Sequence, residues 1–196
     1  MASAPTNNNL DYIPYTTETV SHIASDVIRR LRAADETLGV AESLTAGGVM
    51  AAIATVPDAS AVFRGGAVTY ATELKHDLLG VDNGLIAREG VVHGEVAAQM
   101  AEGARCITTC NPGGAAGCRT TWGLATTGVA GPDPQDGKPA GTVFIAVASP
   151  EGSRSFGPFK FPGSREQVRE ATVLEALARL RGELVARHPD KENEGR

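Results

Sequence analysis

The sequence predicts an α/β fold, a single three-layer α/β/α sandwich with a mixed, mostly parallel sheet of about five strands. Short apolar runs alternate with segments whose apolar residues recur at helical spacing, which is typical of strands joined by crossover helices. The last two apolar runs are joined by the turn at residues 150–152, which predicts an antiparallel hairpin. The 196 residues suffice for one domain with a sizeable core.

In the N-terminal half, helical and strand patterns alternate. The apolar residues before residue 34 fall on one face of a helix, after a threonine that can cap it. Two short apolar runs have the length of buried strands. A threonine and a glycine mark the two ends of the helix that follows the second run. The predicted elements are a helix from Thr17 or a neighbour to about Ala34, a strand at 38–42, a helix at 47–56, a strand at 67–70, and a helix that Thr72 caps and Gly80 ends.

The C-terminal half starts with another helical pattern and ends with the longest one. Between them, residues 108–121 lack periodicity and are predicted to form a surface loop. The segment from Ser164 to Gln167 has the pattern of a capping box and predicts the start of the last helix. The predicted elements are a helix at 94–106, a strand at 123–127, a turn-rich segment at 128–139, strands at 141–148 and 155–161, and a helix from 164 to about 187.

Residues 1–15 are predicted to be a flexible arm, residues 16–187 the domain, and residues 188–196 a frayed tail. The net charge of −5 argues against a nucleic-acid partner bound through a broad basic face. No apolar run approaches the ~18 residues that a membrane span needs, and the N-terminus does not have the pattern of a secretory signal. We therefore expect a cytoplasmic protein whose partner is a small molecule.

The cysteines also favour a cytoplasmic location. Cys106, Cys110 and Cys118 are odd in number and close together in the sequence, which fits free thiols in a reducing environment better than a disulfide framework. Their spacing matches no zinc site, and the four histidines are scattered. We expect neither a metal nor a cofactor.

Candidate catalytic side chains follow two predicted strands. Ser43 is a possible nucleophile, and the amides of Gly47 and Gly48 are predicted to stabilise an oxyanion beside it. Lys75 is the candidate base if it is neutral, which burial or the positive end of a helix would favour. Tyr70 could relay a proton or hold the lysine. Taken singly, each side chain is as readily explained as a cap, a solvated lysine or an edge tyrosine.

Two further segments suggest ligand contacts. Thr127 and Gly128 end a strand before a turn of small residues, which would let a ligand approach the backbone or would simply form a turn. Arg165 lies in the first turn of the last helix, where its charge gains nothing from the helix dipole. A guanidinium beside free helix amides is suited to binding a phosphate or a carboxylate.

Together these segments resemble the CinA C-terminal domain family. The resemblance runs from about residue 20 to 184, in family order and with the family's spacing between Ser43, Tyr70 and Lys75. The segments that carry it are AESLTAGG at 41–48, FRGGAVTYATELK at 63–75, LLGV at 78–81, TGVAGPD at 127–133, KPAGTV at 138–143 and FPGSREQVR at 161–169.

The resemblance implies an amidohydrolase that converts nicotinamide mononucleotide to nicotinate mononucleotide and ammonia, without metal or cofactor. It places the family's serine–lysine dyad on Ser43 and Lys75 and the supporting tyrosine on Tyr70. It also implies a homodimer. The residues that it assigns to substrate binding are Ser60, Thr127, Arg165, Thr45 and Gly128.

Two departures from the family pattern leave alternatives open. Ala46 stands where many members have glycine, and His93 where members usually have serine followed by an acidic residue. If the segment around His93 lines the site, a different amide is the alternative substrate. A non-catalytic nucleotide-binding or regulatory module on the same fold is the other alternative, because fold does not determine function. The presence of both Ser43 and Lys75 favours an enzyme.

Overall fold

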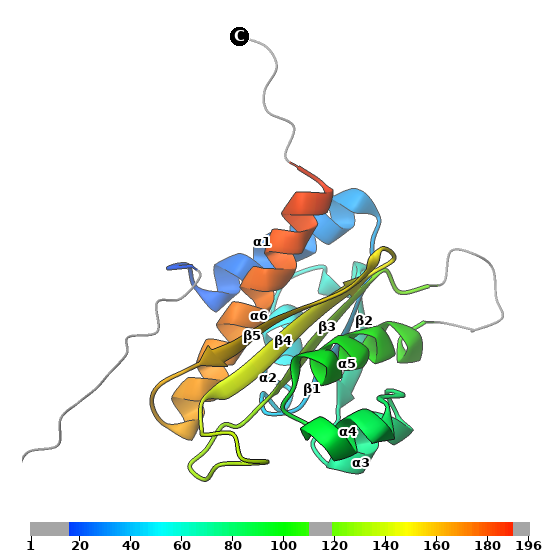
Figure 1. Cartoon of the computed structure of the whole chain (residues 1–196). Coiled ribbons are helices and arrows are strands. Elements are labelled where there is room, and N and C mark those ends of the chain that lie inside the picture. The colour runs from blue at the N-terminus through cyan, green and yellow to red at the C-terminus, as the bar shows by residue number, and fades with distance from the viewer. Residues whose placement is uncertain (1–15, 110–118, 190–196) are drawn as a thin grey trace, which may run out of the picture.

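The computed structural model describes residues 16–109 and 119–189 (Figure 1). The predicted arm at 1–15, residues 190–196 of the predicted tail, and Cys110 and Cys118 lie outside this part of the chain. The elements in chain order are α1 (Val20–Ala34), β1 (Leu38–Glu42), α2 (Gly48–Ala54), a short 3-10 helix (Ala59–Ala61), β2 (Phe63–Val68), α3 (Thr72–Asp77), α4 (Asn83–Glu89), α5 (Gly94–Ile107), β3 (Trp122–Gly128), β4 (Thr142–Ser149), β5 (Gly152–Lys160) and α6 (Arg165–Arg187).

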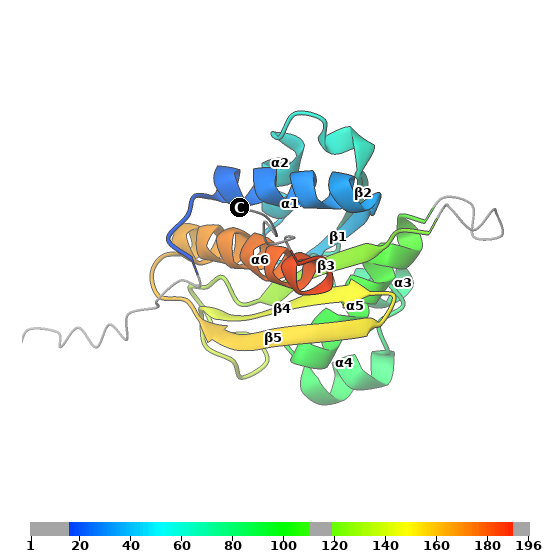
Figure 2. The ribbon, with the colours of Figure 1, turned by 90° about the horizontal axis from the view of Figure 1, so that it is seen from above.

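The strands form one open sheet in the order β2-β1-β3-β4-β5. β1 pairs in parallel with β2 and β3, whereas β4 pairs antiparallel with β3 and β5. Among the described strands, β4 alone therefore runs against the other four. Helices α1, α2 and α6 cover one face of the sheet, and α3, α4 and α5 lie on the other (Figure 2). The predicted three-layer α/β architecture and the hairpin are confirmed.

Side chains of different size fill the two sides of the sheet. The larger apolar core packs under α1, α2 and α6, and the smaller one lies against α5. The central strands present Val40, Leu124 and Ile145 to the first core, and Ala41, Ala125 and Ala146 to the second. A Cβ atom on Gly123 would lie 1.9 Å from the carbonyl oxygen of Ala101, so only glycine allows α5 to lie this close to β3.

Most predicted boundaries lie within a few residues of the observed ones, and the capping box of α6 is confirmed, since Ser164 and Gln167 bond each other's backbone. β2 begins at Phe63 rather than at residue 67, because an edge strand that is only half buried has no continuous apolar run. Thr72 is the first residue of α3 rather than its cap, which is Ala71. Cys106 lies in α5, inside the helix that is predicted at 94–106.

Helix α4 was not predicted. Its seven residues are too few to show a helical period, although Asp82 caps it by accepting a hydrogen bond from the Leu85 amide. Within 16–109 and 119–189, no helix has the length and apolar character needed to cross a membrane.

Candidate active site

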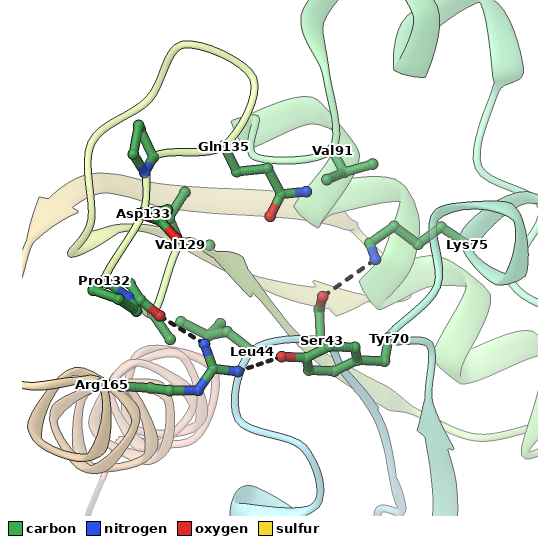
Figure 3. Close-up of a pocket in the computed structure, with 14 residues that line it drawn as sticks. Ser43, Leu44, Tyr70, Lys75, Val91, Val129, Pro132, Asp133, Gln135 and Arg165 are labelled. Atoms are coloured by element: carbon green, nitrogen blue, oxygen red, sulfur yellow. Dashed lines mark hydrogen bonds between the residues drawn. The ribbon is translucent and has the colours of Figure 1, made fainter.

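A pocket of about 410 Å³ opens where β1, β2 and β3 end, beside the first turn of α6 (Figure 3). The carboxyl ends of parallel strands are the usual place for a site in an open α/β sheet. The residues that line it are Ser43, Leu44, Tyr70, Lys75, Val91, Gly128, Val129, Ala130, Gly131, Pro132, Asp133, Pro134, Gln135 and Arg165.

Ser43 and Lys75 meet at the floor of this pocket, as Figure 3 shows. The Lys75 Nζ atom lies 3.2 Å from Ser43 Oγ and donates a hydrogen bond of 2.8 Å to the carbonyl oxygen of Thr69. Ser43 is 8% exposed and Lys75 is 1% exposed. A hydroxyl within hydrogen-bond distance of a buried amine is the arrangement that an activated nucleophile requires.

Burial lowers the pKa of Lys75 from its ordinary 10.5 to about 8, because it disfavours the ammonium form. The negative charge of Glu73 raises this pKa and opposes the effect in part. The predicted contribution of a positive helix end does not apply, since α3 has only six residues and Lys75 also lies in its last turn. A large part of the lysine population is therefore neutral near pH 8.

The turn after β1 is held by a buried carboxylate. Glu42, the last residue of β1, is fully buried and accepts hydrogen bonds from three amides, those of Gly47, Val49 and Met50, at 2.8–3.2 Å. Ala46 and Gly47 have φ angles of 49° and 95°, in the left-handed region that favours glycine. The turn thus reverses sharply into α2, with Ser43 at its start.

The prediction that the amides of Gly47 and Gly48 stabilise an oxyanion is wrong. The Gly47 amide donates to the Glu42 carboxylate, and the Gly48 amide donates to the carbonyl oxygen of Thr45 at 3.0 Å. Both N–H groups are therefore already used. The Leu44 amide directly follows Ser43, and no hydrogen-bond partner for it occurs within the described residues. This amide is the nearest backbone donor to Ser43 that remains available.

Replacing Glu42 with glutamine should lower the free energy of unfolding by about 2 to 4 kcal/mol, because an amide NH₂ would face backbone donors at a fully buried position. Urea unfolding followed by circular dichroism measures this loss. Glu183→Gln is the matched control, since Glu183 pairs with the exposed Arg154 and should change stability by less than about 1 kcal/mol. Equal effects of the two substitutions would contradict the role given to Glu42.

Tyr70 and Arg165 form the outer wall of the pocket. The Arg165 guanidinium donates one hydrogen bond to the Gly131 carbonyl oxygen at 2.7 Å and another to the Tyr70 hydroxyl. Tyr70 thus reaches the pocket as predicted, but its hydroxyl binds the arginine rather than Lys75. These bonds use two of the five N–H groups of the guanidinium, which leaves donors for a ligand.

The other predicted binding residues are only partly brought to the pocket. Gly128 lines it. Thr127 is buried and donates to the Val91 carbonyl oxygen at 2.8 Å, and Thr45 is buried against Thr126 at 2.8 Å. Ser60 lies on the 3-10 helix beside a different hollow. A substrate-binding role for these three residues, which do not line the pocket, remains a prediction.

His93 does not line the pocket. It caps α5, where its Nδ1 atom accepts a hydrogen bond of 3.2 Å from the Glu95 amide. Val91, two residues earlier, is the residue of this segment that reaches the pocket wall. The departure from the family pattern at His93 therefore has a local structural role at the helix start.

Asp133 and Gln135 line the pocket, although no role was predicted for either residue. Both belong to the turn-rich segment 128–139. In Figure 3 the Gln135 side chain extends toward the space above Ser43, and Asp133 lies beside Val129 and Pro132. The sequence feature that could have indicated them is a pair of polar residues within a turn that follows a strand end. Since turns are commonly polar, that signal did not distinguish a pocket wall from an ordinary surface loop.

The fold and the pocket define an α/β protein with a serine–lysine pair buried at the carboxyl ends of parallel strands. The family model of the CinA C-terminal domain matches residues 20–184. The chain belongs to this family. Ala46, whose φ angle is 49°, occupies a backbone conformation suited to the glycine of many members.

Curated relatives and solved structures agree with this assignment. A CinA-like protein of Frankia casuarinae is 46% identical over 80% of this chain, and one of Synechococcus sp. is 42% identical over 83%. The chain spans about a third of these relatives, 33% and 37% of their lengths. The competence damage-inducible protein A of Klebsiella pneumoniae, 29% identical, superposes with a TM-score of 0.77 over 88% of this chain and all of that one.

Proposed function

We propose that the chain is an amidohydrolase that cleaves the carboxamide of nicotinamide mononucleotide to nicotinate mononucleotide and ammonia. The observation that carries the proposal is the contact of 3.2 Å between Ser43 Oγ and the buried amine of Lys75, inside a pocket of about 410 Å³. The reaction class follows from this pair, and the substrate follows from the family resemblance. Membership of the CinA family supports both.

In the acylation step, neutral Lys75 takes the proton of Ser43 as Oγ attacks the carboxamide carbon. The carbonyl oxygen becomes an oxyanion, and the Leu44 amide is the donor adjacent to it. When the tetrahedral intermediate collapses, the C–N bond breaks and the Lys75 ammonium protonates the leaving nitrogen. Ammonia departs, and the acyl group stays on Ser43 as an ester.

In the second step, water attacks the ester carbon and gives a proton to Lys75. The C–O bond to Ser43 breaks, Lys75 returns the proton to Oγ, and the carboxylic acid product leaves and loses its proton to the solvent. The same amine acts as base and then acid twice in each turnover. A pKa of about 8 suits this exchange, because both protonation states are well populated near neutral pH.

The cationic groups of the pocket suit a phosphorylated substrate. Arg165 lies at the pocket wall with N–H groups beyond those that hold Gly131 and Tyr70, and it can donate to a phosphate. Asp133 and Gln135 also line the pocket and supply polar groups suited to ribose hydroxyls. The pocket volume falls within the range of small-molecule sites.

The decisive test is incubation of the purified protein with nicotinamide mononucleotide, nicotinamide riboside or nicotinamide, followed by assays for ammonia and for the acid product. We expect turnover of the mononucleotide and a higher KM for the riboside, which lacks the phosphate. Ammonia from other amides alone would point to a different amide substrate. Binding without turnover would favour the nucleotide-binding module and would overturn the proposal.

The rate should depend on pH through Lys75. Because burial lowers the pKa of this lysine to about 8, the active neutral form grows with pH below that value. We expect kcat/KM to rise about tenfold per pH unit between pH 6.5 and 7.5 and to level off above about 8.5. The second phosphate ionisation, with a pKa near 6, is already about three-quarters complete at pH 6.5 and contributes less than about 1.5-fold to this rise. A flat profile from pH 5 to 9 would exclude a lysine base.

A further inference from the structure

Arg169, one turn after Arg165 in α6, contacts the loop that carries the nucleophile. Its Nε atom donates to the carbonyl oxygen of Leu44 at 3.1 Å, and its Nη2 atom donates to that of Thr45 at 3.0 Å. Both acceptors lie more than a hundred residues before Arg169 in the chain, so the contact links α6 directly to the turn after Ser43.

These bonds fix the peptide planes next to the nucleophile. The Ser43 carbonyl oxygen accepts from the Ala46 amide at 3.1 Å, which fixes the plane that contains the Leu44 N–H group. Arg169 fixes the next two planes through the carbonyl oxygens of Leu44 and Thr45. A planar guanidinium suits this task, because its donors form a rigid fork that reaches two acceptors at once.

Arg165 and Arg169 together connect α6 to the loops after three parallel strands. Arg169 binds the loop after β1, whereas Arg165 binds Tyr70 after β2 and Gly131 after β3. The first two turns of one helix thus contact each loop that brings a polar group to the pocket from a parallel strand end. The two arginines differ in exposure, since Arg165 is exposed and Arg169 is half-buried.

We propose that Arg169 is a positioning residue, which holds the turn after Ser43 through the carbonyl oxygens of Leu44 and Thr45 in the geometry that the reaction needs, without touching the substrate. It is absent from the pocket lining, so its loss should leave substrate binding intact. Small displacements of a reacting group lower the rate strongly, since a shift of about 1 Å can reduce it about a hundredfold. The kinetic part of this inference rests on the proposed function.

The test compares Arg169→Ala with Arg181→Ala on the wild-type background. Arg181 lies further along α6 and pairs with Glu18, away from the pocket, so it controls for loss of a guanidinium from the same helix. With nicotinamide mononucleotide as substrate, Arg169→Ala should lower kcat about ten- to a hundredfold with KM within about threefold. Guanidinium chloride at tens of millimolar should restore part of kcat in Arg169→Ala only.

A second readout does not depend on the substrate. Phenylmethylsulfonyl fluoride should modify Ser43, detected by peptide mass spectrometry, about tenfold more slowly in Arg169→Ala than in Arg181→Ala. If the reagent modifies Ser43 of the wild type but the wild type does not hydrolyse the mononucleotide, the proposed function fails. Slower modification in Arg169→Ala than in Arg181→Ala would still support the inference. Equal labelling and equal kcat in the two variants would overturn the inference alone.

Loss of kcat that guanidinium does not reverse would show that Arg169 serves the fold only, and would also overturn the positioning role. If Arg169→Ala does not fold, Arg169→Lys replaces it, because lysine keeps the charge but lacks the planar fork. The lysine variant should melt near the wild-type temperature and still lose kcat with little change in KM. Wild-type kcat in this variant would count against the inference.

Discussion

Ser43→Ala should reduce ammonia release from nicotinamide mononucleotide about a thousandfold or more, with the fold unchanged. The substitution removes the atom that would form the acyl ester in the proposed reaction. The other hydroxyl on the pocket lining is that of Tyr70, which is bonded to Arg165, so no second nucleophile stands in its place. Initial rates of ammonia release, with circular dichroism for the fold, measure the effect.

The control for this substitution is Ser25→Ala. Ser25 lies on α1, is exposed, and donates to the carbonyl oxygen of Ser21, so it makes the same chemical change far from the pocket. It should keep the wild-type rate. Near-wild-type turnover by Ser43→Ala would show that the assigned nucleophile is wrong, whatever the substrate.

Lys75→Met should lower kcat by about a hundred- to ten-thousandfold, the range that general base catalysis supplies. Methionine fills the buried space of the lysine stem but cannot accept the Ser43 proton, and it leaves the hydroxyl at its ordinary, weak nucleophilicity. Steady-state kinetics at pH 8 measure the loss. Retention of more than about a tenth of kcat would contradict the assignment of Lys75 as base.

The same variant gives a thermodynamic check that needs no substrate. The pKa of Lys75 is about 8 in the folded chain and 10.5 when solvated, so between these values the unfolded state binds more protons. The free energy of unfolding should therefore rise with pH across this window, by at most about 1.4 kcal/mol per pH unit. Urea unfolding between pH 8 and 10 should show this contribution in the wild type and lack it in Lys75→Met.

The sequence was sufficient to predict the pairing of Ser43 and Lys75, because both residues follow strands that run in the same direction. Strand β1 was predicted with its observed bounds, since residues buried on both faces form an unbroken apolar run. The capping box at Ser164 was equally readable, because its signal is confined to four neighbouring residues.

The contacts that shape the site could not be predicted, because each depends on where distant segments meet. Glu42 ends an apolar run, and nothing in that run indicates that its carboxylate turns back to bind amides ahead of it. Arg169 has the acids Glu166 and Glu170 within one turn of its own helix, yet it binds carbonyl groups after β1. Helical periodicity indicates which face of a helix is buried, but it does not indicate which segment packs against that face.

The reversed direction of β4 has a consequence for how the pocket can vary. The end of β3 and the start of β4 lie next to each other at the same end of the sheet. The segment between them therefore begins and ends at neighbouring positions. Its base is already closed by hydrogen bonds, from the Val129 amide to Thr142 and from the Gly141 amide to Val129. Asp133 and Gln135 belong to this loop, whose base is closed by the two hydrogen bonds. Insertions or exchanges there can remodel this wall of the pocket while the Ser43–Lys75 pair, built on other strands, keeps its geometry.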